Sequence, residues 1–296
     1  MTQGLWSIVL AAGAGRRLAG LTGGVPKQFW GPEGWPSLLD VTLSRMAPLS
    51  DPGRTVVVVD RSHGSHVQSL SPDRVGAVLF QPSDRGTAAG VLLALTPVLD
   101  AEPDAVVVVT PSDHGLRDAR RFHSGVLGSV ERVRRDDRVV LFGVAPTRAN
   151  DDYGWIVPGP IDETSGLRPV REFVEKPAAA EAARLLAEGA LWNTMVVVAR
   201  ASTLRGLFAE HLGELARVFD AVRQLPVEAR EGYLAHAYSG LESWDFSRDL
   251  LTPAQHLLVH TWPRSLGWSD LGTPERLAAW FRRPAPALAG RAVDAA

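Results

Sequence analysis

A glycine-rich turn near the start of the chain, followed by two basic residues, could bind an anion. Gly13 and Gly15 follow an apolar run, and glycines at such a point let backbone N–H groups approach a phosphate closely. Arg17 comes two residues after the second glycine, and Lys27 comes ten residues after Arg17. The pattern of a dinucleotide-binding turn is incomplete, because Leu18 stands where a third glycine is needed, and a Walker lysine is missing. The sequence therefore predicts two cations directed at one anion-binding turn.

An acidic residue follows another apolar run. Asp113 comes shortly after four consecutive valines at 106–109. Open α/β sheets bind their ligands at the carboxyl ends of the strands. A carboxylate beside a triphosphate suits Mg²⁺, which takes one or two protein carboxylates together with phosphate oxygens and water. The strand-end position alone leaves a second interpretation open, in which Asp113 is a structural residue in a turn or at a helix N-cap.

The second lysine lies beside an acid in Glu175-Lys176-Pro177. In one strand these two charges would face opposite sides, although the proline ends the strand at once. Lys27 and Lys176 are the two lysines among 31 basic residues, the other 29 being arginines. Lysine offers a compact point charge where arginine imposes a planar fork. An exposed strand end is the alternative for Glu175 and Lys176, but the scarcity of lysine favours a functional role for both lysines.

The elements that must position these residues follow from hydrophobic periodicity. In the first half, short apolar runs alternate with stretches of helical spacing, which is typical of βα units with a largely parallel sheet. The predicted strands are residues 6–12, 55–60, 76–80, 105–110 and 139–144, and the predicted helices are residues 37–47, 87–99 and 118–133. Runs of consecutive valines indicate strands that are buried on both faces.

The second half has a different pattern, with strands interrupted by glycine and proline turns. We predict strands at 153–157, 170–175, 192–199 and 257–262, one helical stretch from 201 to about 235, and a loop at 243–247. A last helix should start at Thr273-Pro274-Glu275, with threonine as N-cap. We expect a single domain over residues 1–283, with a nucleotide-binding half (about 1–145) and a sugar-phosphate half (about 146–283), and a flexible tail at 284–296.

Composition excludes several classes of function. The formal net charge of −2, with acids scattered among the arginines, argues against nucleic acid as a partner. The absence of cysteine excludes disulfides, thiolate nucleophiles and cysteine-ligated metals. The apolar stretch at 5–14 is too short to span a bilayer and no basic residue precedes it, so a cytoplasmic protein without a membrane partner is expected.

Seven blocks of the chain, in order from residue 8 to residue 276, resemble the sugar-1-phosphate nucleotidyltransferases. The blocks are the glycine-rich turn with Pro26-Lys27-Gln28-Phe29, then residues 81–88, 110–114, 153–156, 173–177, 191–194 and 268–276. The Pro-Lys-Gln-Phe block is similar to the mannose-1-phosphate guanylyltransferase branch. The resemblance implies a Rossmann-like α/β fold with a mixed, mostly parallel sheet flanked by helices, of the nucleotide-diphospho-sugar transferase type.

The resemblance also implies a role for each group of residues. Arg17, Lys27 and Lys176 are the expected catalytic cations, and Asp113 and Asp270 are the expected ligands of Mg²⁺. The expected nucleotide-binding residues are Ala11, Ala12, Gly13, Ala14, Gly15, Arg16, Gln81, Gly86 and Thr87. The expected sugar-phosphate-binding residues are Tyr153, Gly154, Glu175, Lys176, Asn193 and Thr194.

The implied reaction joins a sugar 1-phosphate to the α-phosphorus of a nucleoside triphosphate and expels pyrophosphate. The expected partners are GTP and mannose 1-phosphate, and the product is then GDP-mannose. Such chemistry consists mainly of positioning and charge neutralisation. Lys27 and Arg17 would stabilise the triphosphate, while Lys176 would neutralise the sugar phosphate and Glu175 would bind sugar hydroxyls. No general base is needed, because the attacking phosphate is already an anion.

Two departures from the family pattern bear on specificity. Arg16 stands where the family commonly has serine or threonine, and Thr194-Met195 stands where it commonly has Ser-Gly or Ala-Gly. The alternatives are therefore a nucleotidyltransferase for another sugar 1-phosphate, or a non-catalytic homologue that binds a nucleotide sugar and regulates a partner. The sequence leaves the oligomeric state open, a homodimer included.

Histidines are weaker candidates. His63 and His66 have a spacing that could bind metal on a helix, but no third ligand is apparent, and we expect an exposed pair instead. His114 follows Asp113 and could support it without acting as a base.

Overall fold

The central sheet is built from the runs that the apolar pattern predicts. The computed structural model describes residues 4–68, 70 and 73–282. Within them, nine strands form one sheet in the order β3-β2-β1-β4-β8-β5-β9-β7-β6. The strands are β1 (Leu5–Ala11), β2 (Thr55–Asp60), β3 (Ala77–Gln81), β4 (Val106–Pro111), β5 (Val140–Val144), β6 (Gly154–Pro158), β7 (Arg168–Glu175), β8 (Leu191–Arg200) and β9 (Leu258–Trp262).

The two halves of the chain differ in strand direction. β3, β2, β1 and β4 pair in parallel, and the four valines of β2 at 56–59 are buried, as expected for strands covered on both faces. β8 runs antiparallel between β4 and β5, and β6 and β7 pair antiparallel. The predicted α/β fold is confirmed, with parallel pairing confined to β3-β2-β1-β4 and to β5-β9.

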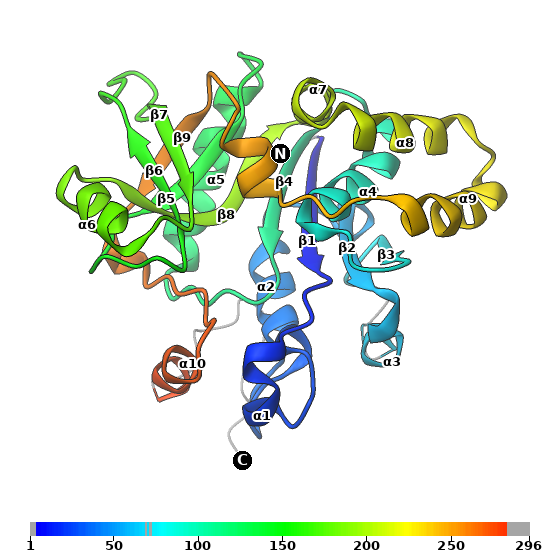
Figure 1. The fold of residues 1–296 in the computed structure, drawn as a ribbon, viewed down its shortest axis with the longest axis horizontal. Helices are drawn as coiled ribbons and strands as arrows, with labels where there is room; N and C mark the ends of the chain where they lie inside the picture. Colours follow the sequence, from blue (N-terminus) through cyan, green and yellow to red (C-terminus); the bar gives the residue numbers. More distant parts are fainter. Residues whose placement is uncertain (1–3, 69, 71–72, 283–296) are drawn as a thin grey trace.

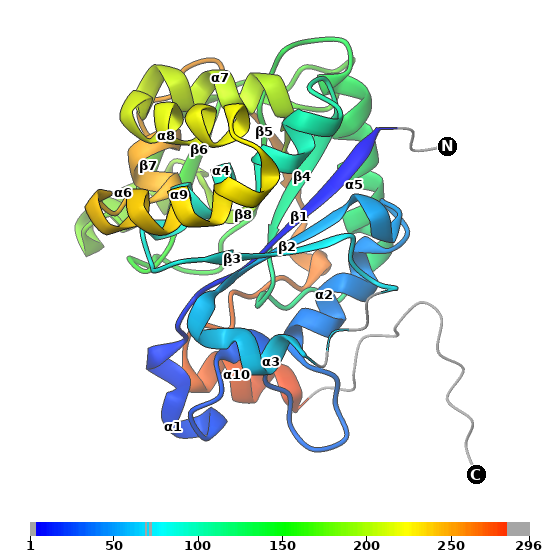
Figure 2. The same ribbon diagram turned by 90° about the vertical axis from the view of Figure 1, so that its right-hand side faces the viewer.

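Helices cover both faces of the sheet, as the two views show (Figures 1 and 2). On one side lie α4 (Gly86–Ala101), α7 (Ala201–His211), α8 (Gly213–Gln224) and α9 (Val227–Gly240), and on the other lie α2 (Leu38–Met46) and α5 (Ala119–Val133). Alternate residues of β1 enter the two cores: Ile8 packs with Leu92 of α4, and Val9 packs with Leu43 of α2. The sheet is therefore the middle layer of three.

Some helices differ from the prediction. The single helical stretch expected from residue 201 is three helices, because Gly213 starts α8 after an irregular Leu212, and Pro226 precedes α9. A further helix, α6 (Ala179–Ala187), lies where no element was predicted. The expected loop at 243–247 runs into a π-helical turn, Phe246–Leu251. Two short helices, α1 (Ala19–Thr22) and α3 (Gly64–Val67), complete the first half.

The last helix, α10 (Pro274–Phe281), starts as predicted, with the Thr273 hydroxyl accepting a hydrogen bond from the Arg276 N–H. Leu277 and Trp280 of this helix pack with Leu18 and Leu38, which belong to the start of the chain. This packing accompanies a contact between Asp270, in the segment before α10, and Lys27. The predicted tail at 284–296 lies outside the described residues.

The predicted exposed histidine pair is wrong for His63. Its ring is buried, and His63 and His66 both contact the ring of Phe29, at centroid distances of 5.6 and 5.2 Å. The aromatic contact explains the burial. In the part of the chain that the structure describes, no helix is long and apolar enough to cross a membrane.

Candidate active site

A cavity of about 500 Å³ lies at the carboxyl ends of β1 and β4 and reaches across to β6, β7 and β8. Segments from both halves of the chain contribute to it. The predicted site residues that line it are Ala12, Gly13, Arg17, Gln81, Gly86, Thr87, Asp113, Tyr153, Gly154, Glu175, Lys176, Asn193 and Asp270. The cavity therefore brings most of the predicted residues into one place.

The glycine-rich turn forms one wall. Gly15 has a left-handed φ of 61°, and a Cβ there would lie 2.9 Å from the backbone nitrogen of Lys27, so the close approach of the two segments requires glycine. The side-chain amide of Gln28 donates to the carbonyls of Ala11 and Gly13, at 2.7 and 2.9 Å, and holds the turn in shape. Gln28 also lines the cavity, and sequence reasoning missed it although it follows Lys27 directly.

The structure does not bring every residue of the predicted turn to the cavity. Arg17 lines it, whereas the neighbouring Arg16 is exposed elsewhere and Ala11 is buried. Ala14 and Gly15 also lie outside the lining. Of the two adjacent arginines, Arg17 is therefore the one that lines the cavity.

Lys27 occupies a different position from the one predicted. It is 5% exposed and lies outside the cavity lining. Its side chain is therefore not positioned for the expected direct contact with a triphosphate. Its ammonium donates to the main-chain oxygen of Asp270 at 2.6 Å and pairs with Asp113 Oδ2 at 3.0 Å. The reason is that Pro26 and the 3₁₀ turn at Lys27–Phe29 direct the side chain inward.

The two predicted metal ligands are therefore held by one buried cation. Burial acts to raise the pKa of Asp113, but the ammonium of Lys27 overrides burial, so the pKa of this carboxyl lies below its ordinary value.

Both Asp113 and Asp270 line the cavity. The described residues contain no group of three or more acidic, histidine or cysteine side chains that could hold a metal ion. Two carboxylates fit a cation such as Mg²⁺ when substrate phosphates supply further oxygens.

Asp270 is also fixed from its other side. Its Oδ1 accepts a hydrogen bond from the Tyr153 hydroxyl at 2.8 Å and lies 3.2 Å from the Arg276 guanidinium, which pairs with Asp152 as well. Burial, reinforced by Asp270, raises the pKa of Tyr153, so this hydroxyl remains a donor. Sequence reasoning placed Arg276 only within a resembling block and did not identify it as a partner of Asp270.

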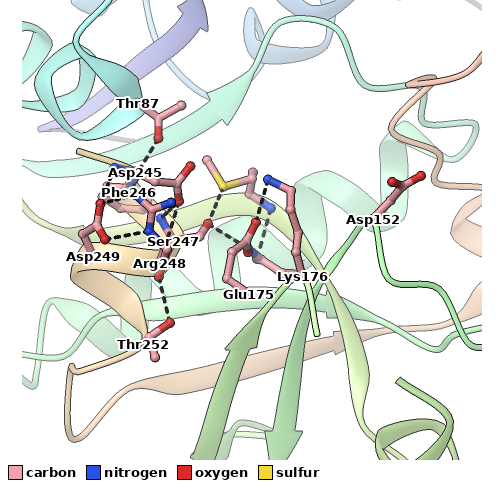
Figure 3. A network of polar contacts seen from close by, with 12 residues as sticks. Thr87, Asp152, Glu175, Lys176, Asp245, Phe246, Ser247, Arg248, Asp249 and Thr252 are labelled. Carbon is pink, nitrogen blue, oxygen red and sulfur yellow. Dashed lines mark hydrogen bonds and ion pairs between the residues drawn. The ribbon is translucent and has the colours of Figure 1, made fainter. Parts of the chain in front are cut away.

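Glu175 and Lys176 form the facing wall (Figure 3). Lys176 Nζ lies 3.2 Å from Glu175 Oε1, and 59% of the lysine side chain is exposed. β7 ends at Glu175, and the left-handed φ of 46° at Lys176 lets both side chains line the cavity. Burial raises the pKa of Glu175, against the opposing effect of Lys176. A Cβ at Gly154 would lie 2.5 Å from Glu175 Oε2, so this glycine provides room for the carboxylate.

Thr194 does not contribute its side chain to the cavity. It is fully buried, and its hydroxyl donates to the Phe142 carbonyl at 2.6 Å. Asn193 and Met195 line the cavity instead. Thr194 was predicted to bind the sugar phosphate, but its side chain does not reach the cavity, because an irregularity in β8 turns that side chain toward β5.

A segment that sequence reasoning left as a plain loop also lines the site. Ser243, Asp245 and Ser247 belong to the cavity lining. The Asp245 carboxylate accepts from the N–H groups of Ser247 and Arg248, at 2.9 and 2.8 Å, and so starts the π-helical turn (Figure 3). Its position next to Glu175 could not be predicted, because these residues are far apart in the chain.

This segment is attached to the first turn of α4. The Phe246 N–H donates to the Thr87 hydroxyl at 2.8 Å (Figure 3), and the Ala88 N–H donates to the Trp244 carbonyl at 3.1 Å. Gly86 has a φ of 81°, and a Cβ there would clash with the Trp244 carbonyl oxygen. Near them, Gln81 lines the cavity, and its buried side-chain amide interacts with the Tyr238 hydroxyl.

Comparisons with known proteins show the family of the chain. The model of the family described as "Nucleotidyl transferase" matches residues 6–283. The xanthan biosynthesis protein XanB of Xanthomonas campestris pv. campestris (strain B100) is 30% identical over 283 residues, which cover 90% of this chain and 57% of XanB. The mannose-1-phosphate guanylyltransferase RfbM of Salmonella typhimurium is 28% identical, with 90% and 56% covered. The chain thus spans a little over half the length of these relatives.

Solved structures resemble the whole fold. A protein from Thermus thermophilus, described as a mannose-1-phosphate geranyltransferase, superposes with a TM-score of 0.84 at 28% identity, covering 95% of this chain and 80% of its own. A UDP-glucose pyrophosphorylase in complex with UDP-glucose is similar in fold alone, with a TM-score of 0.58 at 13% identity, covering 94% of this chain and 98% of its own.

Proposed function

The chain belongs to the nucleotidyl transferase family, and from this premise we propose that it transfers a nucleotidyl group from a nucleoside triphosphate to a sugar 1-phosphate. The observation that carries the proposal is the composition of one cavity. A glycine-rich turn with Arg17 forms one wall, two carboxylates lie at the strand ends, and Glu175 with Lys176 forms the facing wall. This arrangement suits two phosphate-bearing substrates that must be brought together.

In the proposed reaction, a phosphate oxygen of the sugar 1-phosphate attacks the α-phosphorus of the triphosphate. The bond between the α-phosphorus and the bridging oxygen breaks, and pyrophosphate leaves with that electron pair. Lys176 neutralises the incoming phosphate, and Arg17 stabilises the charge that develops on pyrophosphate. Because both substrates are anions, positioning and neutralisation by these cations provide most of the catalysis.

Asp113 and Asp270 are the residues that would hold Mg²⁺, and a bound Mg²⁺ would supply charge neutralisation and orientation at the phosphates. Lys27 holds both carboxylate residues in place from behind. Arg276 and Tyr153 orient the Asp270 carboxylate from the other side. The protein thus prepares the two carboxylates before any ligand binds.

We propose GTP and mannose 1-phosphate as the substrates, with GDP-mannose as the product. The support is the description of relatives such as RfbM and the Pro26-Lys27-Gln28-Phe29 block. Gln81 would contact the base, and Glu175 with Asn193 would bind sugar hydroxyls. The cytoplasmic location expected from the sequence remains part of the proposal.

The test is pyrophosphate release, measured with Mg²⁺ over a grid of nucleoside triphosphates and sugar 1-phosphates. We expect the highest kcat/KM for GTP with mannose 1-phosphate. A higher value for another pair would replace the proposed substrates but keep the reaction class. Silence over the whole grid, together with tight binding of a nucleotide sugar, would favour the non-catalytic homologue instead.

A further inference from the structure

Met195 has a backbone conformation that a side chain of its size rarely adopts. Its φ is 60°, in the left-handed region, where glycine is favoured and bulky residues are uncommon. The family pattern commonly has glycine at this position. Strained backbone of this kind persists where the surrounding structure enforces it, and it is concentrated at functional sites. The backbone conformation of Met195 is therefore not explained by the φ/ψ preference of methionine, and its cause lies in the surrounding structure.

An irregularity in β8 produces this conformation. Leu141 of β5 pairs with Val197 of β8, and Gly143 pairs with Asn193, so residues 194–196 lie opposite the single residue Phe142. The Thr194 hydroxyl bonds to the Phe142 carbonyl, and Asn193 Oδ1 accepts from the Met195 N–H at 3.1 Å. Bulges near active sites commonly redirect a side chain. Here the bulge buries Thr194 and brings Met195 to the cavity.

The Met195 side chain lies among the groups expected to bind the sugar. Its sulfur accepts a hydrogen bond from the Ser247 hydroxyl at 3.1 Å, and both residues line the cavity. The Asn193 amide lies 3.5 Å from the same hydroxyl. Glu175 and Asp245 line this part of the cavity as well. The neighbours of Met195 are thus polar groups that match sugar hydroxyls, whereas Met195 adds apolar bulk.

We propose that Met195 is a specificity-determining residue that limits the size of the sugar. Its side chain takes up volume beside Asn193 and Ser247 that a glycine would leave empty. The subsite therefore accepts a hexose 1-phosphate with free ring hydroxyls and excludes one with a larger substituent, such as an acetamido or methoxy group, on the face that meets Met195. This inference rests on the proposed function, because it assumes that a sugar phosphate occupies this side of the cavity.

The experiment compares wild type, Met195→Gly and Met195→Leu. Each protein is assayed for pyrophosphate release with GTP and a panel of mannose 1-phosphate, N-acetylmannosamine 1-phosphate and the 3-, 4- and 6-O-methyl derivatives of mannose 1-phosphate. In Met195→Gly, at least one derivative should gain about tenfold or more in kcat/KM relative to mannose 1-phosphate, since even one methylene in a pocket discriminates by about that factor. Met195→Leu, of similar volume, should keep the wild-type selectivity.

A matched control comes from His256, an exposed residue with a φ of 61° outside the cavity lining. His256→Gly relieves the same kind of backbone strain and should leave selectivity unchanged. If wild type uses mannose 1-phosphate but Met195→Gly shows the same preferences, the inference is wrong and the proposed function stands. If neither protein turns over any pair in the full grid of nucleoside triphosphates and sugar 1-phosphates, the proposed function fails. The affinities of wild type and Met195→Gly for mannose 1-phosphate and N-acetylmannosamine 1-phosphate, measured by calorimetry, then test the inference. If the ratio of the two affinities is the same in both proteins, the inference is wrong.

Discussion

The ammonium of Lys27 lies 3.0 Å from Asp113 Oδ2 inside the protein, although the two residues belong to different βα units. The same ammonium donates to the Asp270 main chain at 2.6 Å. One buried lysine thus connects both carboxylate segments of the cavity. It neutralises Asp113 in advance, which limits the repulsion that phosphates would otherwise meet there.

Lys27→Met should weaken both the fold and the activity. We expect a loss of free energy of unfolding on the order of 2 kcal/mol, because the lysine is buried but Asp113 is partly exposed. The folded-state pKa of Asp113 is lowered, so its pairing stabilises the protein above the ordinary aspartate pKa and is lost as pH falls through the folded-state pKa. The difference between wild type and Lys27→Met, measured by urea unfolding, should therefore be largest near neutral pH and shrink in acid.

The matched control is Arg184→Met, which removes an exposed cation paired with Glu181 and Glu188. Exposed pairs contribute little, so stability and turnover should stay near wild type. If the difference in free energy of unfolding between Lys27→Met and wild type did not depend on pH, the stabilising role of the Lys27–Asp113 pair would be contradicted.

Arg17→Ala should remove most of the activity while the protein stays folded. Arg17 lines the cavity, and loss of one preorganised charge typically lowers the rate on the order of 100- to 1,000-fold. Arg16→Ala removes the same charge one residue away, outside the cavity lining, and should have a much smaller effect. Steady-state pyrophosphate release with both variants measures the contrast. Equal losses would show that the general charge of the turn matters and the position of Arg17 does not.

The two glycines of the turn should respond differently to alanine. At Gly15, a φ of 61° and a Cβ 2.9 Å from the Lys27 nitrogen predict a loss of about 1–3 kcal/mol in free energy of unfolding. At Gly13, nothing lies within 4 Å of an added Cβ, so stability should stay near wild type. Gly13 lines the cavity, however, and Gly13→Ala should raise the KM for the triphosphate. Urea unfolding and kinetics separate the two effects, and a stable Gly15→Ala protein would refute the close approach.

The pH dependence of sugar-phosphate use should report Glu175. Burial raises the pKa of Glu175 and Lys176 opposes that shift, so the ionised carboxylate, which we propose accepts sugar hydroxyl bonds, is lost as pH falls. Lys176→Met removes the opposing charge, and the acid limb of kcat/KM for the sugar 1-phosphate should move to higher pH, with turnover lowered on the order of 100-fold. Glu175→Gln should flatten that limb. If the acid limb is unchanged in both variants, it reports the titration of a group other than Glu175.

Local patterns in the sequence determined the elements and much of the cavity. Consecutive valines predicted the buried strands β2 and β4, and Thr273-Pro274 predicted the start of α10, because strand burial and helix capping depend on residues near one another in the chain. The glycine-rich turn and the resembling blocks contain most of the residues that line the cavity.

Tertiary structure alone decided which side chains meet. Lys27 reaches Asp270 because α10 packs against the start of the chain, and the 243–247 segment reaches Thr87 because it crosses the first turn of α4. The bulge in β8 buried Thr194 and brought Met195 to the cavity, since the two extra residues opposite Phe142 interrupt the regular alternation of side chains at this point. Such contacts depend on packing between segments that are distant in the chain, so they cannot be predicted from a local sequence pattern.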